Sequence, residues 1–94
     1  MPAHLVTVIE SVDDPDAYAD YRAAVPALVD RHGGSYLVRS TDVEVLEGDR
    51  PATRVLVLAF PDVAAIHAMF DDPDYLAVAD LRRQATTGTV MVVG

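Results

Sequence analysis

The sequence predicts an α+β fold of the ferredoxin-like type, in which a four-stranded antiparallel sheet carries its helices on one face. Three observations lead to this fold. Strand and helix patterns follow one another in the order strand, helix, strand, strand, helix, strand. The motif Asp-Asp-Pro-Asp occurs twice, each time where a helix is expected to begin. The third and last strands are apolar on both sides, which predicts that the sheet also buries its helix-free face.

Composition and charge restrict the class of protein. A chain of 94 residues that is 51% hydrophobic predicts one domain, residues 1–94, held together by packing. The absence of cysteine excludes disulfides and is typical of a cytoplasmic protein, and no apolar stretch approaches the roughly 20 residues of a membrane span. The net charge of −8 would repel a phosphate backbone. We therefore expect a cytoplasmic protein that binds neither nucleic acid nor a membrane.

The first half of the chain predicts a strand and a long helix. The strand, His4–Val12, is rich in β-branched residues, and the segment 13–16 then caps a helix with Asp and places Pro in its first turn. Pro26 is expected to bend or restart this helix, and Gly33 and Gly34 to end it, one of them in the left-handed conformation. One helical face carries the residues Tyr18, Tyr21, Val25, Leu28 and His32.

The second half predicts a hairpin, two shorter helices and a final strand. Its turn is expected in the segment 47–51, which contains Gly and Pro, and an irregularity is expected at residues 39–42. A repeated Asp-Asp-Pro-Asp motif starts the last helix. The predicted elements are the strands Tyr36–Val45 and Arg54–Phe60, the helix Val63–Asp71, a helix ending at Ala85, and the strand Gly88–Val93.

Alternation along the third strand predicts the oligomeric state. Val55, Val57 and Ala59 point to one side of the sheet, and Leu56, Leu58 and Phe60 point to the other side. The helices cover only one face, so we expect the second face to pack against the same face of another copy. The sequence therefore predicts an obligate homodimer.

Motifs spread along nearly the whole chain resemble one protein family. In order, they are Tyr18 and Tyr21 after Asp-Asp-Pro-Asp, His32-Gly33-Gly34 before Arg39, Glu47-Gly48, Asp72-Pro73-Asp74-Tyr75, and Leu81-Arg82. Their order and spacing resemble the domain of unknown function 1330 family. The resemblance implies a dimeric α/β barrel, a superfamily that includes cofactor-free monooxygenases, muconolactone isomerases and polyketide cyclases. The chain departs from the family pattern at Met69-Phe70, where a Trp-Tyr pair is usual, and at Ser40, where Gly is common.

Two residues are candidates for catalysis, each with a structural alternative. His32 lies at the end of the first helix, where it either caps the helix or serves as a general base. Arg39 lies among apolar strand residues, where its charge needs a partner. That partner is either Glu47 across the hairpin or the carboxylate or enolate of a ligand.

A ligand between the helices and the sheet is expected to contact six further residues. Aromatic rings bury their area while a hydroxyl finds a polar partner, and an arginine on the last helix either ties that helix down or closes over a pocket. The candidate binding residues are Tyr18, Tyr21, Glu47, Phe70, Tyr75 and Arg82. The histidines are scattered and the acidic clusters contain Pro, so we expect neither a metal nor another cofactor.

Two functional hypotheses follow from these residues. In the first, a homodimeric, cofactor-independent isomerase, cyclase or monooxygenase binds a small apolar molecule that bears a carbonyl group. His32 then acts as base or hydrogen-bond partner, Arg39 or Arg82 stabilises an oxyanion, and Tyr18 orients the substrate. In the second, the protein is a non-catalytic dimeric binding or accessory protein, and the same His, Arg and Glu residues form a structural network.

Overall fold

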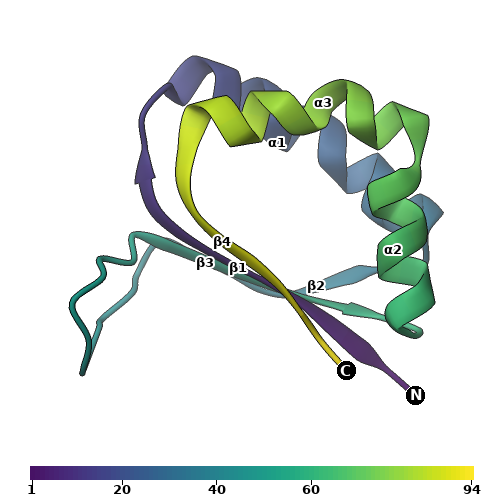
Figure 1. The fold of residues 1–94 in the computed structure, drawn as a ribbon, viewed down its shortest axis with the longest axis horizontal. Coiled ribbons are helices and arrows are strands. Elements are labelled where there is room, and N and C mark those ends of the chain that lie inside the picture. Colours follow the sequence, from purple (N-terminus) through teal and green to yellow (C-terminus); the bar gives the residue numbers. More distant parts are fainter.

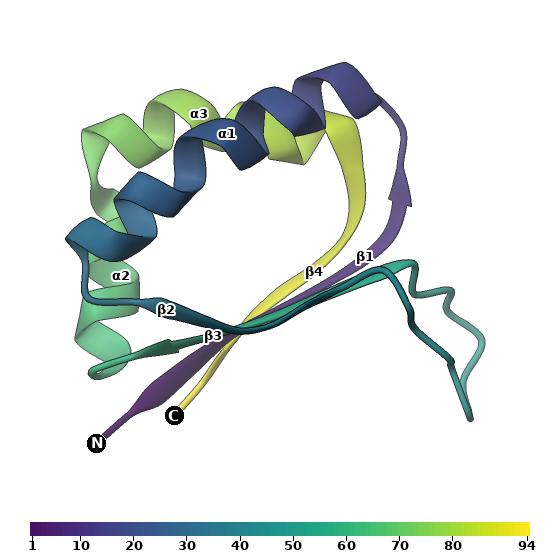
Figure 2. The same cartoon turned by 180° about the vertical axis from the view of Figure 1, so that it is seen from behind.

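A computed structural model describes all residues, 1–94, and confirms the ferredoxin-like α+β class. The four strands form one antiparallel sheet in the order β2-β3-β1-β4. All three helices lie on one face of the sheet (Figure 1), and the view from behind shows the opposite face without a covering element (Figure 2). The elements are β1 (Ala3–Val12), α1 (Pro15–Arg31), β2 (Ser35–Ser40), β3 (Arg54–Phe60), α2 (Val63–Asp71), α3 (Pro73–Ala85) and β4 (Thr86–Val93).

Local capping chemistry starts each helix at or next to the predicted residue. The side chains of Asp14, Asp62 and Asp72 each accept a hydrogen bond from a backbone N–H in the first turn of the helix that follows. α1 continues through Pro26 and does not restart there. It ends at Arg31, and Gly33, two residues later, has a φ of +78°, the predicted left-handed conformation. None of the helices is long and apolar enough to cross a membrane.

The second strand is shorter than predicted. β2 ends at Ser40, because the Ser40 hydroxyl accepts a hydrogen bond from the backbone N–H of Asp42 and turns the chain out of the sheet. The irregularity lies between Tyr36 and Val38, where the register with β3 shifts, and not at residues 39–42. The segment 41–53 is therefore a long loop between β2 and β3, and it bends away from the helices (Figure 1).

The main core fills the space between the helices and the inner face of the sheet. It contains Leu5, Leu28, Val29, Leu58, Phe60, Ile66, Met69 and Tyr75, all buried. The predicted alternation along β3 holds, because Leu58 and Phe60 are buried while Val55 and Val57 are only half-buried. In the strand register Val57 is opposite Val6, and Val6 is opposite Met91, so these apolar side chains share the face that no helix covers.

Candidate functional site

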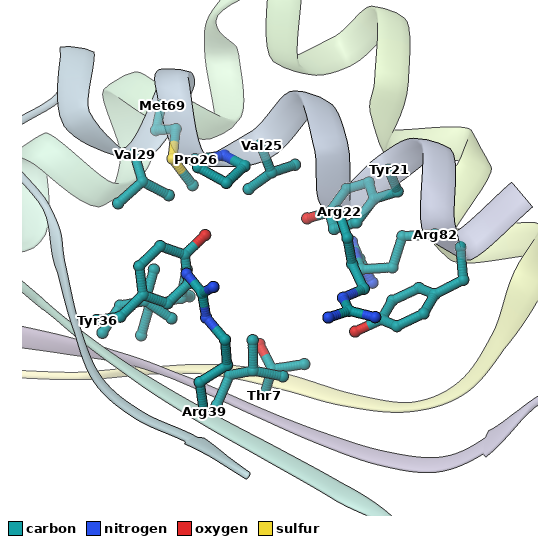
Figure 3. A pocket seen from close by; sticks show the side chains of 14 residues that line it. Thr7, Tyr21, Arg22, Val25, Pro26, Val29, Tyr36, Arg39, Met69 and Arg82 are labelled. Carbon is teal, nitrogen blue, oxygen red and sulfur yellow. The ribbon is translucent and has the colours of Figure 1, made fainter. Parts of the chain in front are cut away.

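A cavity of about 110 Å³ lies on the helix side of the sheet. All three helices and strands β1, β2 and β3 contribute to its walls, so segments far apart in the sequence meet around it (Figure 3). Nine of its 14 lining residues are hydrophobic, and Leu5, Leu56, Leu58 and Met69 are among them. Such a lining favours the apolar body of a small organic molecule.

α1 forms the longest wall of the cavity. Tyr18, Tyr21, Arg22, Val25 and Val29 line it, and their spacing of three or four residues puts them on the helix face that looks toward the sheet. Tyr18 and Tyr21 stack with ring centroids 6.2 Å apart and an interplanar angle of 15°. The two rings give this end of the cavity a flat aromatic wall.

The bulge in β2 brings two polar residues to the cavity. Tyr36 and Arg39 are three positions apart, so a regular strand would place them on opposite faces of the sheet. The register shift before Val38 sets Tyr36 opposite Leu58 and Arg39 opposite Leu56, both on the inner face. The Arg39 guanidinium then stacks on the Tyr36 ring with its Cζ 3.8 Å from the ring centroid (Figure 3).

The arginines fall into two groups. Three of the seven form ion pairs: Arg31 with Asp72 and Asp74, Arg50 with Glu10, and Arg83 with Asp80. The other four have no carboxylate partner and lie over tyrosine rings. These are Arg22 and Arg54 over Tyr18, Arg39 over Tyr36, and Arg82 over Tyr21. Arg22, Arg39 and Arg82 line the cavity, and no Asp or Glu does, so its walls carry a net positive charge.

The tyrosine hydroxyls at the cavity are hydrogen-bond donors at neutral pH. Tyr21 lies 3.1 Å from Tyr75, hydroxyl to hydroxyl, and one of the two donates to the other. Burial, together with the neighbouring Tyr75, raises the pKa of Tyr21 far above its ordinary value. Burial also raises the pKa of Tyr36. Both hydroxyls therefore stay protonated.

A second polar group joins the C-terminal end of α1 to the start of α3, and we call it the junction cluster: Arg31, His32, Asp72 and Asp74. His32 Nε2 donates to Asp72 Oδ2 over 2.8 Å. One Arg31 nitrogen donates to Asp72 Oδ2 over 2.9 Å and to Asp74 Oδ2 over 2.8 Å. The hydrogen bond from His32 is the largest cause that lowers the pKa of Asp72 to about 2, followed by the backbone N–H of Asp74 and by Arg31.

Residues 2–94 match the protein family described as Domain of unknown function (DUF1330). The chain belongs to this family. The resemblance in its motifs is thereby confirmed. No curated protein matches the sequence.

Solved structures with the same fold have low sequence identity to this DUF1330 chain. A protein of unknown function from Rhodopseudomonas palustris is 24% identical, with a TM-score of 0.78, over 98% of this chain and 80% of that one. A dimeric ferredoxin-like protein of unknown function from Thermobifida fusca is 15% identical, with a TM-score of 0.68, over 100% of this chain and 91% of that one. SnoaB, a cofactor-independent oxygenase from Streptomyces nogalater, is 16% identical, with a TM-score of 0.61, over 99% of this chain and 89% of that one. These likenesses show the fold.

The fold of this DUF1330 chain brings together only part of the predicted site. Tyr18, Tyr21, Arg39 and Arg82 line the cavity. His32 lies in the junction cluster, and Tyr75 packs behind the cavity against Phe70, with ring centroids 4.8 Å apart. The predicted pairing of Arg39 with Glu47 is wrong. Because β2 ends at Ser40, Glu47 lies exposed in the loop and forms no ion pair.

Sequence reasoning missed Thr7, Arg22 and Tyr36, which all line the cavity. Arg22 lies four residues after Tyr18, so helical spacing predicts that the two share a face and was sufficient to find it. Tyr36 reaches the inner face together with Arg39 through the bulge, which has no signal in the sequence. No group of three or more His, Cys, Asp or Glu side chains lies close enough together to hold a metal ion.

Proposed function

We propose that this protein is a homodimer in which each subunit binds a small apolar, carbonyl-bearing organic molecule in the cavity. The observation that supports this function is the combination of an apolar lining with several hydrogen-bond donors on the same walls. The apolar walls hold the body of the molecule. The guanidinium groups of Arg39 and Arg82 and the Tyr21 hydroxyl are donors for its carbonyl oxygen.

The same donors suit cofactor-independent chemistry at a carbonyl group. Guanidinium groups stabilise the negative charge that develops on the oxygen when an enolate forms, the step shared by many isomerases, cyclases and cofactor-free oxygenases. The likeness in fold to the cofactor-independent oxygenase SnoaB is in keeping with this role. His32 is not in the lining, so the geometry favours polarisation of the carbonyl over proton abstraction by His32.

We propose that the uncovered sheet face forms the dimer. Val6, Val57 and Met91 share this face, and the cavity lies on the opposite side, so each subunit keeps its own cavity in the dimer. Leu46, in the loop between β2 and β3, is a further apolar side chain that is 85% exposed. The Thermobifida fusca protein of the same fold is described as dimeric. Burial of a Val or Leu side chain contributes roughly 1.5–3 kcal/mol, so several such residues favour a stable pair.

Ligand-observed NMR with acetophenone, an aryl ketone of one ring, tests the binding. We expect the native protein to bind acetophenone and the variant Val25→Phe, whose ring fills the cavity, to lose the signal. Leu76→Phe, on the exposed outer side of α3, is the matched control and should keep it. Near-ultraviolet circular dichroism verifies that both variants fold. Absence of binding to the native protein, or equal binding to Val25→Phe, would contradict the proposal.

Deuterium exchange separates an enzyme from a binding protein. In enolisation a solvent base takes a proton from the methyl group of acetophenone, while the arginines stabilise the enolate oxygen. In D2O the enolate carbon then takes up a deuteron, so 1H NMR measures the rate directly. We expect the native protein to accelerate exchange and Arg39→Met to lose the acceleration. Binding without acceleration supports the second candidate, a non-catalytic binding protein.

Light scattering coupled to size-exclusion chromatography tests the dimer. We expect a mass of two chains at micromolar concentration, and Val57→Lys, which places a charge in the uncovered face, to shift the protein toward monomers. A stable native monomer at that concentration would disprove the proposed dimer.

A further inference from the structure

We infer that the ligand of the cavity is an anion, a monocarboxylate on a flat apolar body of about one ring. This inference rests on the proposed function and narrows its substrate class. It starts from the charge balance of the molecule. The protein has a net charge of −8, yet the walls of its cavity contain three arginines and no acidic residue. The negative charges of the protein lie elsewhere, and this positive charge is left without a partner inside the chain.

The unpaired guanidinium groups lie on several sides of the cavity. Arg39 reaches in from β2, Arg22 extends from α1 toward the sheet, and Arg82 comes from α3 (Figure 3). Arg82 is half-buried, where a charge without a partner is costly. Arg54 lies next to this group over the Tyr18 ring, and its buried Nε has no hydrogen-bond partner. A neutral carbonyl accepts hydrogen bonds from the guanidinium groups but does not neutralise their charge. A carboxylate accepts the hydrogen bonds and also neutralises the charge.

The positive region continues beyond Arg82. A second cavity of about 170 Å³ on its other side is lined by Thr7, Arg82, Arg83 and Thr86, and it too contains no acidic residue. Arg82 and Thr7 line both cavities. An anion held by Arg82 therefore has the Thr7 hydroxyl group beside it, and no Asp or Glu lines either cavity.

The surroundings favour a carboxylate over a phosphate. Phosphate sites commonly use the free amide groups at the start of a helix, but in α1 Pro15 has no amide hydrogen, and the N–H groups of Ala17 and Tyr18 already donate to Asp14. The net charge of −8 also repels a multiply charged ligand once it comes within roughly 8 Å of the acidic surface, the screening distance at physiological salt. A single negative charge meets the least repulsion.

The size and shape of the cavity indicate the body of the ligand. A volume of about 110 Å³ is in the range of the roughly 150 Å³ cavity that holds one benzene molecule in a protein core. The stacked rings of Tyr18 and Tyr21 offer a flat face to a flat molecule. We therefore expect one aromatic or unsaturated ring that carries the carboxylate.

Benzoate and benzamide form a matched pair of probes for this inference, because they have the same shape and differ in charge. Titration of the 15N-labelled full chain by NMR is expected to show benzoate binding at least about tenfold more tightly than benzamide. Raising the salt concentration should weaken the binding of benzoate and leave the binding of benzamide unchanged. Arg39→Met and Arg22→Met should each reduce the preference for benzoate, and Arg39→Lys should keep part of it. Arg50→Met, in the exposed loop and away from the cavity, is the control.

The outcomes distinguish the two proposals. If acetophenone binds and benzoate binds no more tightly than benzamide, the ligand is not selected for charge and the inference is overturned, while the proposed function stands. If benzoate binds but Arg39→Met and Arg22→Met, folded by circular dichroism, keep its full preference, the inference is also overturned. If neither acetophenone nor benzoate binds, the proposed function fails together with it.

Discussion

The junction cluster and the cavity both contain arginine, but they use it in opposite ways. In the junction cluster Arg31 and His32 meet Asp72 within 3 Å, and every charge has a partner. At the cavity Arg22, Arg39 and Arg82 meet only tyrosine rings and hydroxyl groups. Arg22 and Arg39 are exposed, so water solvates their charges, whereas Arg82 is half-buried, where an unpaired charge is costly. At Arg82 the cavity therefore sacrifices some stability, which is typical of binding sites.

Both arrangements occur on one helix. Arg22 and Arg31 are nine residues apart in α1, which is two and a half helical turns, so they leave the helix on opposite sides. One side faces the cavity and the other faces α3. The pattern separates two tasks within a single helix, and variants in either group should affect one task and spare the other.

Replacing Tyr75 should have the largest effect, because this residue connects the two regions. It lies one turn after Asp72 in α3, is 1% exposed, and its hydroxyl bonds Tyr21 at the cavity. Tyr75→Ala should lower the free energy of unfolding by about 3–5 kcal/mol, measured by chemical denaturation. Tyr75→Phe keeps the ring and is the matched control. Equal losses in the two variants would show that the hydroxyl pair, and not the packing, is what matters.

His32→Ala should have the second largest effect, and on stability alone. It removes the hydrogen bond to the Asp72 carboxylate, so we expect the free energy of unfolding to fall by about 1–2 kcal/mol. Ligand affinity should stay unchanged, because His32 does not line the cavity. His67→Ala, at an exposed position of α2, is the control. If His32→Ala instead lost ligand binding and kept native stability, His32 would belong to the functional site and the two regions would not differ in role.

These contrasts mark what the sequence could and could not predict. Helix starts were predictable because a cap such as Asp62 acts on amides only a few residues away. The partner of His32 was not, because Asp72 is 40 positions away and meets it only after α1 and α3 pack. Likewise Arg39 needed the bulge in β2 to reach the cavity, and a bulge depends on how two strands pair. Local features such as helix caps could therefore be predicted from the sequence, whereas the contacts that assemble the site could not.

Matched substitutions of two arginines sharpen the comparison further. Arg31→Met removes two ion pairs and should lower the free energy of unfolding measurably. Arg22→Met removes a charge that has no carboxylate partner, so the free energy of unfolding should stay within about 0.5 kcal/mol of the native value. Denaturant titration of both variants under the same conditions compares them directly. A larger loss for Arg22→Met would mean that the cavity arginines are structural.

Acid titration should show the smallest effect, confined to the junction cluster. Asp72 has a pKa lowered from 3.8 to about 2 in the folded protein, so its ionised form favours folding. That contribution is complete above the unfolded pKa near pH 4 and is lost as the pH falls through about 2. Denaturation at a series of pH values should therefore show a decline in this window that is weaker in Asp72→Asn. Asp16→Asn, exposed in α1 and outside the cluster, should keep the native profile. A native profile in Asp72→Asn as well would show that the cluster does not hold the two helices together through its charge.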